Sequence, residues 1–325
     1  MTLLLDANDA NDLARAASLL RAGELVAVPT ETVYGLAADA RQPAAVRAIF
    51  AAKNRPADHP LIVHLGDVAQ LADWAVDIPP AAHTLIERFW PGPLTLVLHK
   101  APGVDPVVTG GHATVALRMP AHPALLALLK TSGLAVAAPS ANPHKRLSPT
   151  SAAHVMESMA GKLAAVLDGG DCALGIESTI LDLTGEMPQV LRAGPVTASA
   201  IAEQLGCPVA TPSQHSVAVP GNMPEHYQPR TPVRLKSAQE MVEHTAYPVA
   251  RILLSLDAGQ AGATFALTRA MPRDKPEYAR QLYRALHDAD RLQVQEIWVE
   301  TPPATEEWAD VIDRLLRASG GTRQP

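Results

Sequence analysis

The first two thirds of the sequence alternate between helical and strand patterns, and this alternation constrains the fold more than any other feature. Residues 9–22 place apolar side chains at helical spacing, and Gly23 ends this run before the apolar segment 24–29, a predicted buried strand. Further helices are predicted at 42–53, from 67, at 79–90, 122–130, 149–161 and 197–206, and further strands at 61–65, 94–100, 113–119, 134–140, 164–170 and 178–184. Such alternation is typical of an α/β domain with a mixed sheet.

The pattern changes after Gly206. Residues 207–232 contain six prolines and no sustained periodicity, which is typical of a linker. Beyond this segment, strand patterns at 248–256 and 295–300 and helical patterns at 276–292 and 308–319 predict a small α/β unit. The expected organisation is therefore a domain at 1–206, a Pro-rich linker at 207–232 and a second domain at 233–325.

Charge and cysteine content exclude several classes of protein. The net charge is -6, with 15 basic and 20 acidic residues up to Arg230 and 12 against 13 after it. Proteins that hold nucleic acid through its phosphates normally contain a basic domain, so direct nucleic-acid binding is disfavoured. The two cysteines, Cys172 and Cys207, form no disulfide or zinc pattern, and no apolar stretch is long enough to cross a membrane. A cytoplasmic protein without a membrane segment is expected.

The common catalytic signatures are missing from the sequence. There is no G-x-x-x-x-G-K-[ST] loop and no G-x-G-x-x-G after a strand, so neither a P-loop nor a dinucleotide fold is expected. G-x-S-x-G and H-E-x-x-H are also absent, which leaves standard hydrolase and zinc protease mechanisms without a motif.

Polar and basic residues instead gather at the ends of apolar strands, where α/β proteins place their ligands. The segments at these strand ends also have plain structural interpretations. PTET could be a helix cap, Lys53 and Arg55 could lie in a solvated turn, and PSAN could be a loop. The basic residues beside these strand ends are Lys53, Arg55, Arg118, Lys145, Arg146 and Arg192. Because Arg binds phosphate bidentately and Lys supplies a point charge, this clustering predicts a polyphosphate-binding cleft.

Seven blocks, in this order and spacing, resemble the threonylcarbamoyl-adenylate synthases of the YrdC/Sua5 family. The blocks are PTETVYGLAADA, KNRPADHPLIVH, FWPGPLTLVL, ALRMPAHP, APSAN, STILDL and VLRAGP. The likeness covers residues from about 10 to 206, nearly the whole of the first predicted domain. His226 and Tyr227, with LYRALHDAD and VIDRLLRASGG, resemble the long Sua5 type. The implied fold is a YrdC-like twisted mixed sheet with helices and a basic cleft, followed by a small C-terminal α/β Sua5 domain.

The resemblance implies a nucleotidyltransferase that condenses L-threonine, bicarbonate and ATP into threonylcarbamoyl-AMP and pyrophosphate. Mg²⁺ would arrive with ATP, with no tightly bound cofactor and no protein metal ligands. Transferase proteins downstream would place the threonylcarbamoyl group on adenosine 37 of tRNA, so tRNA is a partner only indirectly. Attack on a phosphorus needs positioning and charge stabilisation rather than a covalent nucleophile, which agrees with the missing hydrolase motifs.

The resemblance also implies a role for individual residues. Arg118 would pair with the threonine carboxylate, and Lys53 and Arg55 would act in catalysis as well as in phosphate binding. Tyr227, on the linker, would close over the nucleotide as a lid. The full threonine set is Thr32, His64, Arg118, Ala138 and Ser178, and the ATP set is Lys53, Arg55, Thr114, Ser140, Ser148, Arg192 and Tyr227.

Alternatives remain open for single residues and for the whole chain. His64 could be a satisfied core histidine, and Ser148 could cap a helix that starts near Thr150. His59 stands where the family usually has Asn, Glu225 where its linker often has a basic residue, and 301–310 lacks an expected Gly-rich turn. The competing functions are an RNA-binding module and a carbamoyl-transfer domain of the kind found in hydrogenase-maturation proteins.

Overall fold

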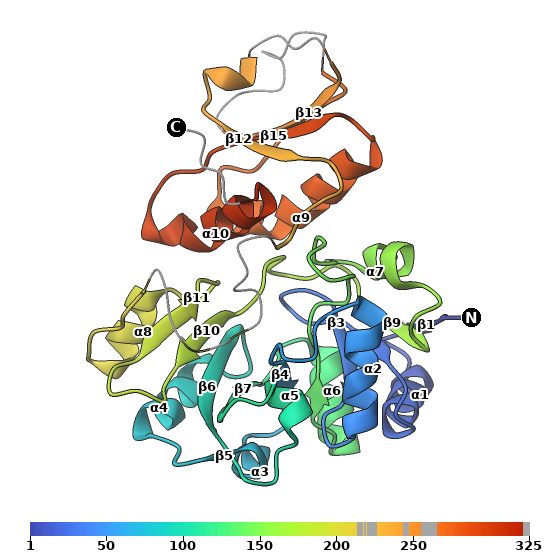
Figure 1. Cartoon of the computed structure of the whole chain (residues 1–325), viewed down its shortest axis with the longest axis vertical. Coiled ribbons are helices and arrows are strands. Elements are labelled where there is room, and N and C mark those ends of the chain that lie inside the picture. Colours follow the sequence, from blue (N-terminus) through green and yellow to red (C-terminus); the bar gives the residue numbers. More distant parts are fainter. Residues whose placement is uncertain (213–216, 218, 220–225, 243–246, 255–264, 321–325) are drawn as a thin grey trace. The chain divides into compact units, whose positions relative to one another are not determined.

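The computed structural model of the protein describes residues 1–212, 217, 219, 226–242, 247–254 and 265–320 (Figure 1). The chain divides into two compact units. The first unit contains 1–144, 149–173 and the described residues of 177–222, and the second contains 145–148, 174–176 and the described residues from 226 onward. None of the described helices is long and apolar enough to span a membrane.

Within the described part of the first unit, eleven strands form one mixed sheet. Their spatial order is β1-β9-β2-β3-β8-β4-β7-β6-β10-β11, and β5 pairs with β6. The pairs β1–β9, β9–β2, β4–β7 and β6–β10 are parallel and the others antiparallel, so the predicted mixed sheet is confirmed. The strands are β1 (Leu3–Asp6), β2 (Val26–Val28), β3 (Gly35–Asp39), β4 (Ile62–His64), β5 (Ala75–Val76), β6 (Leu94–Lys100), β7 (Thr114–Arg118), β8 (Val136–Ala137), β9 (Ala165–Asp168), β10 (Thr179–Asp182) and β11 (Gln189–Arg192).

Local sequence signals set the helix ends of this unit. The Asp9 side chain accepts hydrogen bonds from the backbone N–H groups of Asn11 and Asp12 and so caps α1. Gly133 and Gly206 end α6 and α8 in the left-handed conformation, which glycine adopts without steric strain. The helices are α1 (Ala10–Arg21), α2 (Pro43–Lys53), the 3₁₀ turn η1 (Val68–Gln70), α3 (Leu71–Trp74), α4 (Pro80–Phe89), α5 (Pro106–Thr109), α6 (Pro123–Ser132), α7 (Ala152–Met159) and α8 (Ala198–Leu205).

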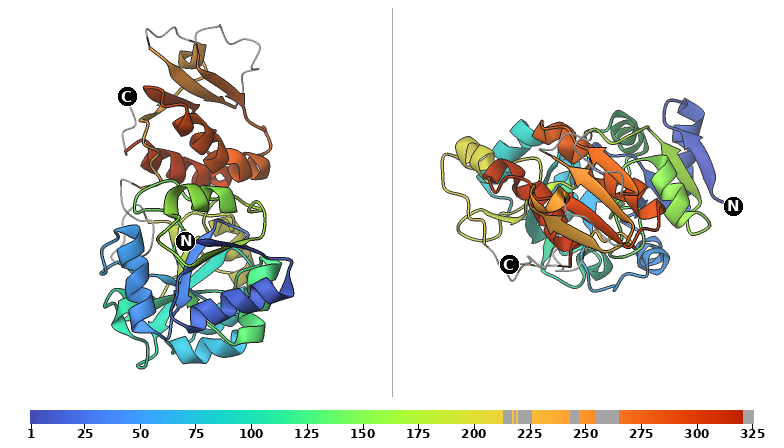
Figure 2. Two further views of the ribbon diagram at one scale, coloured as in Figure 1. Left: turned by 90° about the vertical axis from the view of Figure 1, so that its right-hand side faces the viewer. Right: turned by 90° about the horizontal axis from the view of Figure 1, so that it is seen from above.

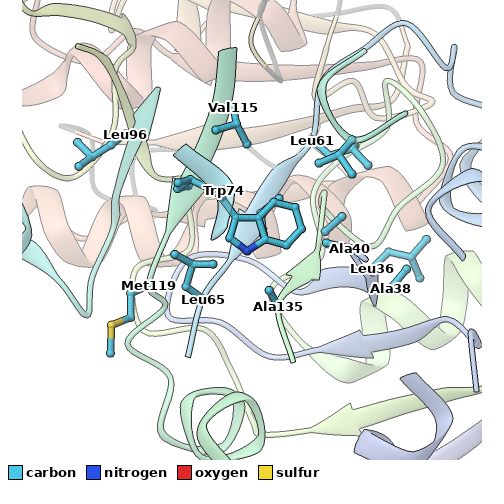
Figure 3. Packing of buried hydrophobic residues seen from close by; sticks show 14 of the residues in the cluster. Leu36, Ala38, Ala40, Leu61, Leu65, Trp74, Leu96, Val115, Met119 and Ala135 are labelled. Carbon is cyan, nitrogen blue, oxygen red and sulfur yellow. The ribbon is translucent and has the colours of Figure 1, made fainter. Parts of the chain in front are cut away.

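Side chains cover both faces of this sheet, as the alternation along β3 shows. Leu36 and Ala38 lie in one cluster of buried residues together with Trp74 (Figure 3). Ala37, between them, belongs to another cluster that includes Leu20 of α1 and Leu125 of α6. Successive strand residues point to opposite faces, so a strand with apolar residues throughout is buried on both sides.

The second unit contains a parallel sheet with the order β12-β15-β13-β14. Two helices, α9 and α10, cover one face of this sheet (Figure 2). Its elements are β12 (Val233–Lys236), the 3₁₀ turn η2 (Glu240–Val242), β13 (Val249–Leu253), β14 (Leu267–Ala270), α9 (Lys275–Arg291), β15 (Glu296–Glu300), the 3₁₀ turn η4 (Glu306–Trp308) and α10 (Ala309–Ala318).

Two short segments from the first part of the sequence belong to this second unit. The backbone N–H of Gln228 donates to the carbonyl oxygen of Lys145 over 2.8 Å, and His287 Nε2 donates to the carbonyl oxygen of Ser148 over 3.2 Å. Gly175 lies against the backbone of Arg280 in α9. The unit is therefore assembled from three stretches of chain.

Candidate active site

The PTET segment forms a tight loop between β2 and β3. The Thr30 hydroxyl accepts hydrogen bonds from the backbone N–H groups of Thr32 and Val33, each over 3.1 Å, and donates to the Val33 carbonyl over 2.6 Å. No helix follows, because residues 35–39 continue directly as β3, so the interpretation of PTET as a helix cap is wrong. The loop buries Glu31 and Thr32 inside the protein.

Arg118, at the end of β7, connects this loop to the rest of the site. Its Nη1 donates to the Thr32 hydroxyl over 3.0 Å, and its Nε donates to the Gly92 carbonyl over 3.0 Å. Its Nη2 forms an ion pair with the Glu31 carboxylate. The Arg118 residue is 3% exposed and Glu31 is 8% exposed, so the ion pair is buried. Arg118 and Thr32 are predicted from the sequence, whereas Glu31 is not; its sequence signal is its place between two threonines of the PTET block.

His64 pairs with Arg118 across the neighbouring parallel strands β4 and β7. Its side chain is buried, and burial together with the positive charge of Arg118 lowers the pKa of His64 to about 3. The imidazole is therefore neutral near pH 7. Among the described residues, its Nδ1 has no hydrogen-bond partner. The nearby Ala138 donates its backbone N–H to the Ile62 carbonyl over 3.1 Å.

Ser178 and Arg192 form a second buried pair. Arg192 Nη2 donates to the Ser178 carbonyl over 2.8 Å and to the Ser178 hydroxyl over 3.1 Å. The same hydroxyl lies 2.8 Å from the Thr95 hydroxyl. The antiparallel pairing of β10 with β11 brings these residues together, since Ile180 lies opposite Arg192.

Lys53 and Arg55 lie at the end of α2, beside the PSAN segment. The Lys53 ammonium donates to the carbonyl oxygens of Ser140 and Asn142, and Arg55 Nη2 donates to the Pro60 carbonyl over 3.1 Å. Burial first, and then the charge of Arg55, hold the pKa of Lys53 below its ordinary value. Both side chains are buried, so the interpretation of KNRP as a solvated turn is wrong.

His59, noted above as a departure from the family pattern, lies next to this basic pair. Burial and the positive charge of Arg55 lower the pKa of His59, while the charge of Asp58 opposes this shift. The His59 ring centroid is 5.6 Å from that of His144. The His59 imidazole therefore binds a proton less readily than an exposed histidine side chain.

Two further residues of the predicted ATP set are Thr114 and Ser148. Thr114 begins β7, at the opposite end of that strand from Arg118. Ser148, with Lys145 and Arg146, belongs to the second unit. Ser148 caps no helix, because the Ser151 side chain accepts from the His154 N–H and caps α7; the capping interpretation is wrong.

Tyr227 also belongs to the second unit, where it is 1% exposed. Its ring makes an edge contact with His226 at 4.1 Å between centroids and a tilted contact with Tyr283 at 5.9 Å. The Arg314 guanidinium lies 5.3 Å from the ring centroid, which is within cation–π range. Tyr227 has a φ of 57°, an uncommon value for a residue with a bulky side chain. Glu225, where the linker departs from the family pattern, lies outside the described residues.

Two family models match the chain, one after the other. The Sua5, YciO and YrdC model, described as telomere recombination, matches residues 18–194. The model described as the C-terminal domain of threonylcarbamoyl-AMP synthase matches residues 195–320. Together they span both units of the structure.

Individual relatives agree with these models. A threonylcarbamoyl-AMP synthase of Bacillus subtilis is 39% identical over 98% of this chain and 95% of its own length. The structure of Pyrococcus abyssi Sua5 complexed with L-threonine is 37% identical, with a TM-score of 0.88 over 98% of both chains. A His-to-Ala and Tyr-to-Ala double variant of that protein gives a TM-score of 0.90 over 98% of this chain and 97% of its own. The chain therefore belongs to the YrdC/Sua5 family of threonylcarbamoyl-AMP synthases, in the long form that carries a Sua5 C-terminal domain.

Proposed function

We propose that the chain condenses L-threonine, bicarbonate and ATP into threonylcarbamoyl-AMP and pyrophosphate, with the Arg118 cluster as the threonine site. Threonylcarbamoyl-AMP synthesis, a nucleotidyl transfer that uses ATP, is the activity of the family to which the chain belongs. The observation that carries the threonine assignment is the buried arginine that already contacts the Thr32 hydroxyl. The Arg118 guanidinium keeps N–H groups beyond the one that pairs with Glu31, and its planar fork matches the geometry of an amino acid carboxylate.

The donor count of Arg118 supports this assignment. A guanidinium has five N–H groups, and the described contacts use three of them, on Gly92, Thr32 and Glu31. One N–H on each terminal nitrogen remains for a substrate carboxylate. The neutral His64 and the Thr32 hydroxyl supply polar atoms for the rest of the amino acid, and Ser178 and Ala138 complete the proposed set.

ATP is the proposed ligand of the second group of residues. Lys53, Arg55 and Arg192 supply positive charge, and Thr114, Ser140 and Ser148 supply hydrogen-bonding groups. The described residues contain no group of three or more His, Cys, Asp or Glu side chains that could hold a metal ion. We propose that Mg²⁺ arrives as part of the substrate, bound by the phosphate oxygens of ATP. The Lys53 ammonium uses two of its three N–H groups on the Ser140 and Asn142 carbonyls, which leaves one for a phosphate oxygen.

The proposed reaction forms two bonds. One joins the threonine nitrogen to the carbon of bicarbonate, with loss of water. The other joins a bicarbonate-derived oxygen to the α-phosphorus of ATP, and the bond from this phosphorus to the pyrophosphate oxygen breaks. Arg55 and Lys53 stabilise the negative charge that accumulates on the departing pyrophosphate.

Residues 207–232 are proposed as the linker between a catalytic domain at 1–206 and a Sua5 domain at 233–325. Tyr227 is proposed to close over the nucleotide as a lid. The ring is buried against Tyr283 and Arg314 within the second unit, so this role requires it to leave those contacts when the nucleotide binds. The product is proposed to pass, in the cytoplasm, to the proteins that modify tRNA, so the chain meets tRNA only through them.

The test is pyrophosphate release by the full chain with Mg²⁺ and ATP, omitting L-threonine and bicarbonate in turn. Release that requires both substrates is expected, and Arg55→Ala should lower it by roughly 100-fold because a buried charge at the reacting phosphates is lost. Arg47→Ala is the matched control, since Arg47 is an exposed arginine of the same helix α2. Release that proceeds without threonine would overturn the proposal and favour a carbamoyl-transfer reaction.

A further inference from the structure

Glu31 is a buried charge at the site that the proposed roles leave unexplained. It belongs to the PTET loop, whereas Arg118 ends β7. One carboxylate oxygen accepts from Arg118 Nη2, and the other accepts from the backbone N–H of Ala121 over 3.0 Å. Glu31 therefore bridges the Arg118 side chain to the backbone just beyond that strand.

Three acceptors define the plane of the Arg118 guanidinium. Gly92 accepts from Nε, Thr32 from Nη1 and Glu31 from Nη2, so each nitrogen of the group has one partner. Three acceptors at three different nitrogens leave a planar group little freedom to rotate. The orientation of its two remaining N–H groups is then set before any substrate arrives, which reduces the entropy lost on binding.

We infer that Glu31 is a positioning residue for threonine recognition, which aims the two remaining N–H groups of Arg118 at the substrate carboxylate. This inference rests on the proposed role of Arg118. It differs from the simpler expectation that an acidic residue on this arginine competes with the substrate. The two views predict opposite effects when the charge of Glu31 is removed.

The Glu31→Gln variant separates these views. Gln keeps the size of the side chain, but its amide NH₂ faces one of the two donors, Arg118 Nη2 or Ala121 N–H, so one of those bonds is lost. Binding of L-threonine and of L-threoninamide, which lacks the carboxylate, is measured by calorimetry. We expect L-threonine to bind about 10- to 100-fold more weakly and L-threoninamide to change much less, because hydrogen bonds to charged groups are among the strongest in proteins.

Steady-state kinetics supply a readout that a merely structural role would not move. In Glu31→Gln the KM for threonine should rise while the KM for ATP stays near its wild-type value. Asp182→Asn is the matched control, because Asp182 is a buried acid of β10 whose carboxylate accepts from the Thr184 N–H and hydroxyl, away from Arg118. This control should keep the wild-type preference for threonine over threoninamide.

Three results would overturn the inference. The first is tighter threonine binding in Glu31→Gln, which indicates competition, and the second is an equal loss for both ligands, which indicates a role outside carboxylate recognition. The third needs no variant: a structure of the wild-type chain with L-threonine in which Arg118 has left Glu31. This wild-type structure decides the question even if the variant does not fold.

A further variant separates the inference from the proposed function. Arg118→Gln should abolish the preference for threonine over threoninamide. If Arg118→Gln keeps the preference, the proposed threonine site is wrong. If Arg118→Gln loses it and Glu31→Gln keeps it, the site stands and only the positioning role of Glu31 fails.

Discussion

His64 shows how the charge state of one site residue depends on its surroundings. Its pKa falls from the ordinary 6.5 to about 3 because the ring is buried beside Arg118. The unfolded chain therefore binds a proton more readily than the folded chain between these two values. The contribution of His64 to the free energy of unfolding is therefore greatest above pH 6.5. It is lost as the pH falls toward 3, with a slope of up to about 1.4 kcal/mol per pH unit for one proton. The measurement is the free energy of unfolding between pH 4 and 7, together with NMR titration of the His64 ring.

In that measurement, His64→Asn should flatten the dependence of stability on pH. The matched control is His83→Asn, because His83 is exposed on α4. A His64 signal that titrates near pH 6.5 would contradict the lowered pKa of the buried ring.

The hairpin of β10 and β11 shows how an element sets the position of a site residue. A Cβ on Gly194, just after β11, would lie 2.2 Å from the Thr179 backbone nitrogen and 2.6 Å from the Ser178 carbonyl carbon. Gly194→Ala should therefore displace the start of β10 and the Ser178 hydroxyl that Arg192 contacts. We expect a loss of about 1–3 kcal/mol in unfolding free energy, together with a fall in activity. Denaturant unfolding and pyrophosphate release measure the two effects.

The connection between the same strands provides the control for this variant. At Gly185 the nearest atom to an added Cβ is the Met187 carbonyl oxygen at 4.0 Å, so Gly185→Ala should change neither quantity. Equal effects of the two substitutions would mean that the backbone at Ser178 adjusts freely.

At the scale of the whole molecule, the second unit depends on a segment far away in the sequence. Gly175 has a φ of 75°, and its added Cβ would lie 2.5 Å from the Arg280 carbonyl oxygen in α9. Gly170 has a similar φ of 81° but open space around it. Both Gly→Ala variants impose backbone strain, so their difference isolates the packing on α9. We expect Gly175→Ala to destabilise the chain by about 1–3 kcal/mol more than Gly170→Ala, with faster hydrogen exchange in α9. Equal losses would show that residues 174–176 contribute little to the second unit.

Much of the fold could be predicted from the sequence because helices and long apolar strands are encoded locally. Two examples are α1, which begins after Asp9, and α8, which ends before Gly206. Both agree with the predicted helices to within two residues, since caps and 3.6-residue periodicity act over short distances. The strands that the sequence patterns do not predict are short or contain weak strand formers. One example is β3, whose sequence GLAAD becomes a strand only because β2 and β8 flank it.

The sequence by itself determined the residue types available for chemistry and, through the seven blocks, the family and its activity. Tertiary structure decided which of them meet. Glu31 and Arg118 are 87 positions apart and carry no shared local pattern, yet they form a buried ion pair. The same holds for segments 145–148 and 174–176, which join the second unit. Such partners depend on strand order and burial, and these are decided only when the whole sheet assembles, whereas helix ends depend on neighbours within one turn.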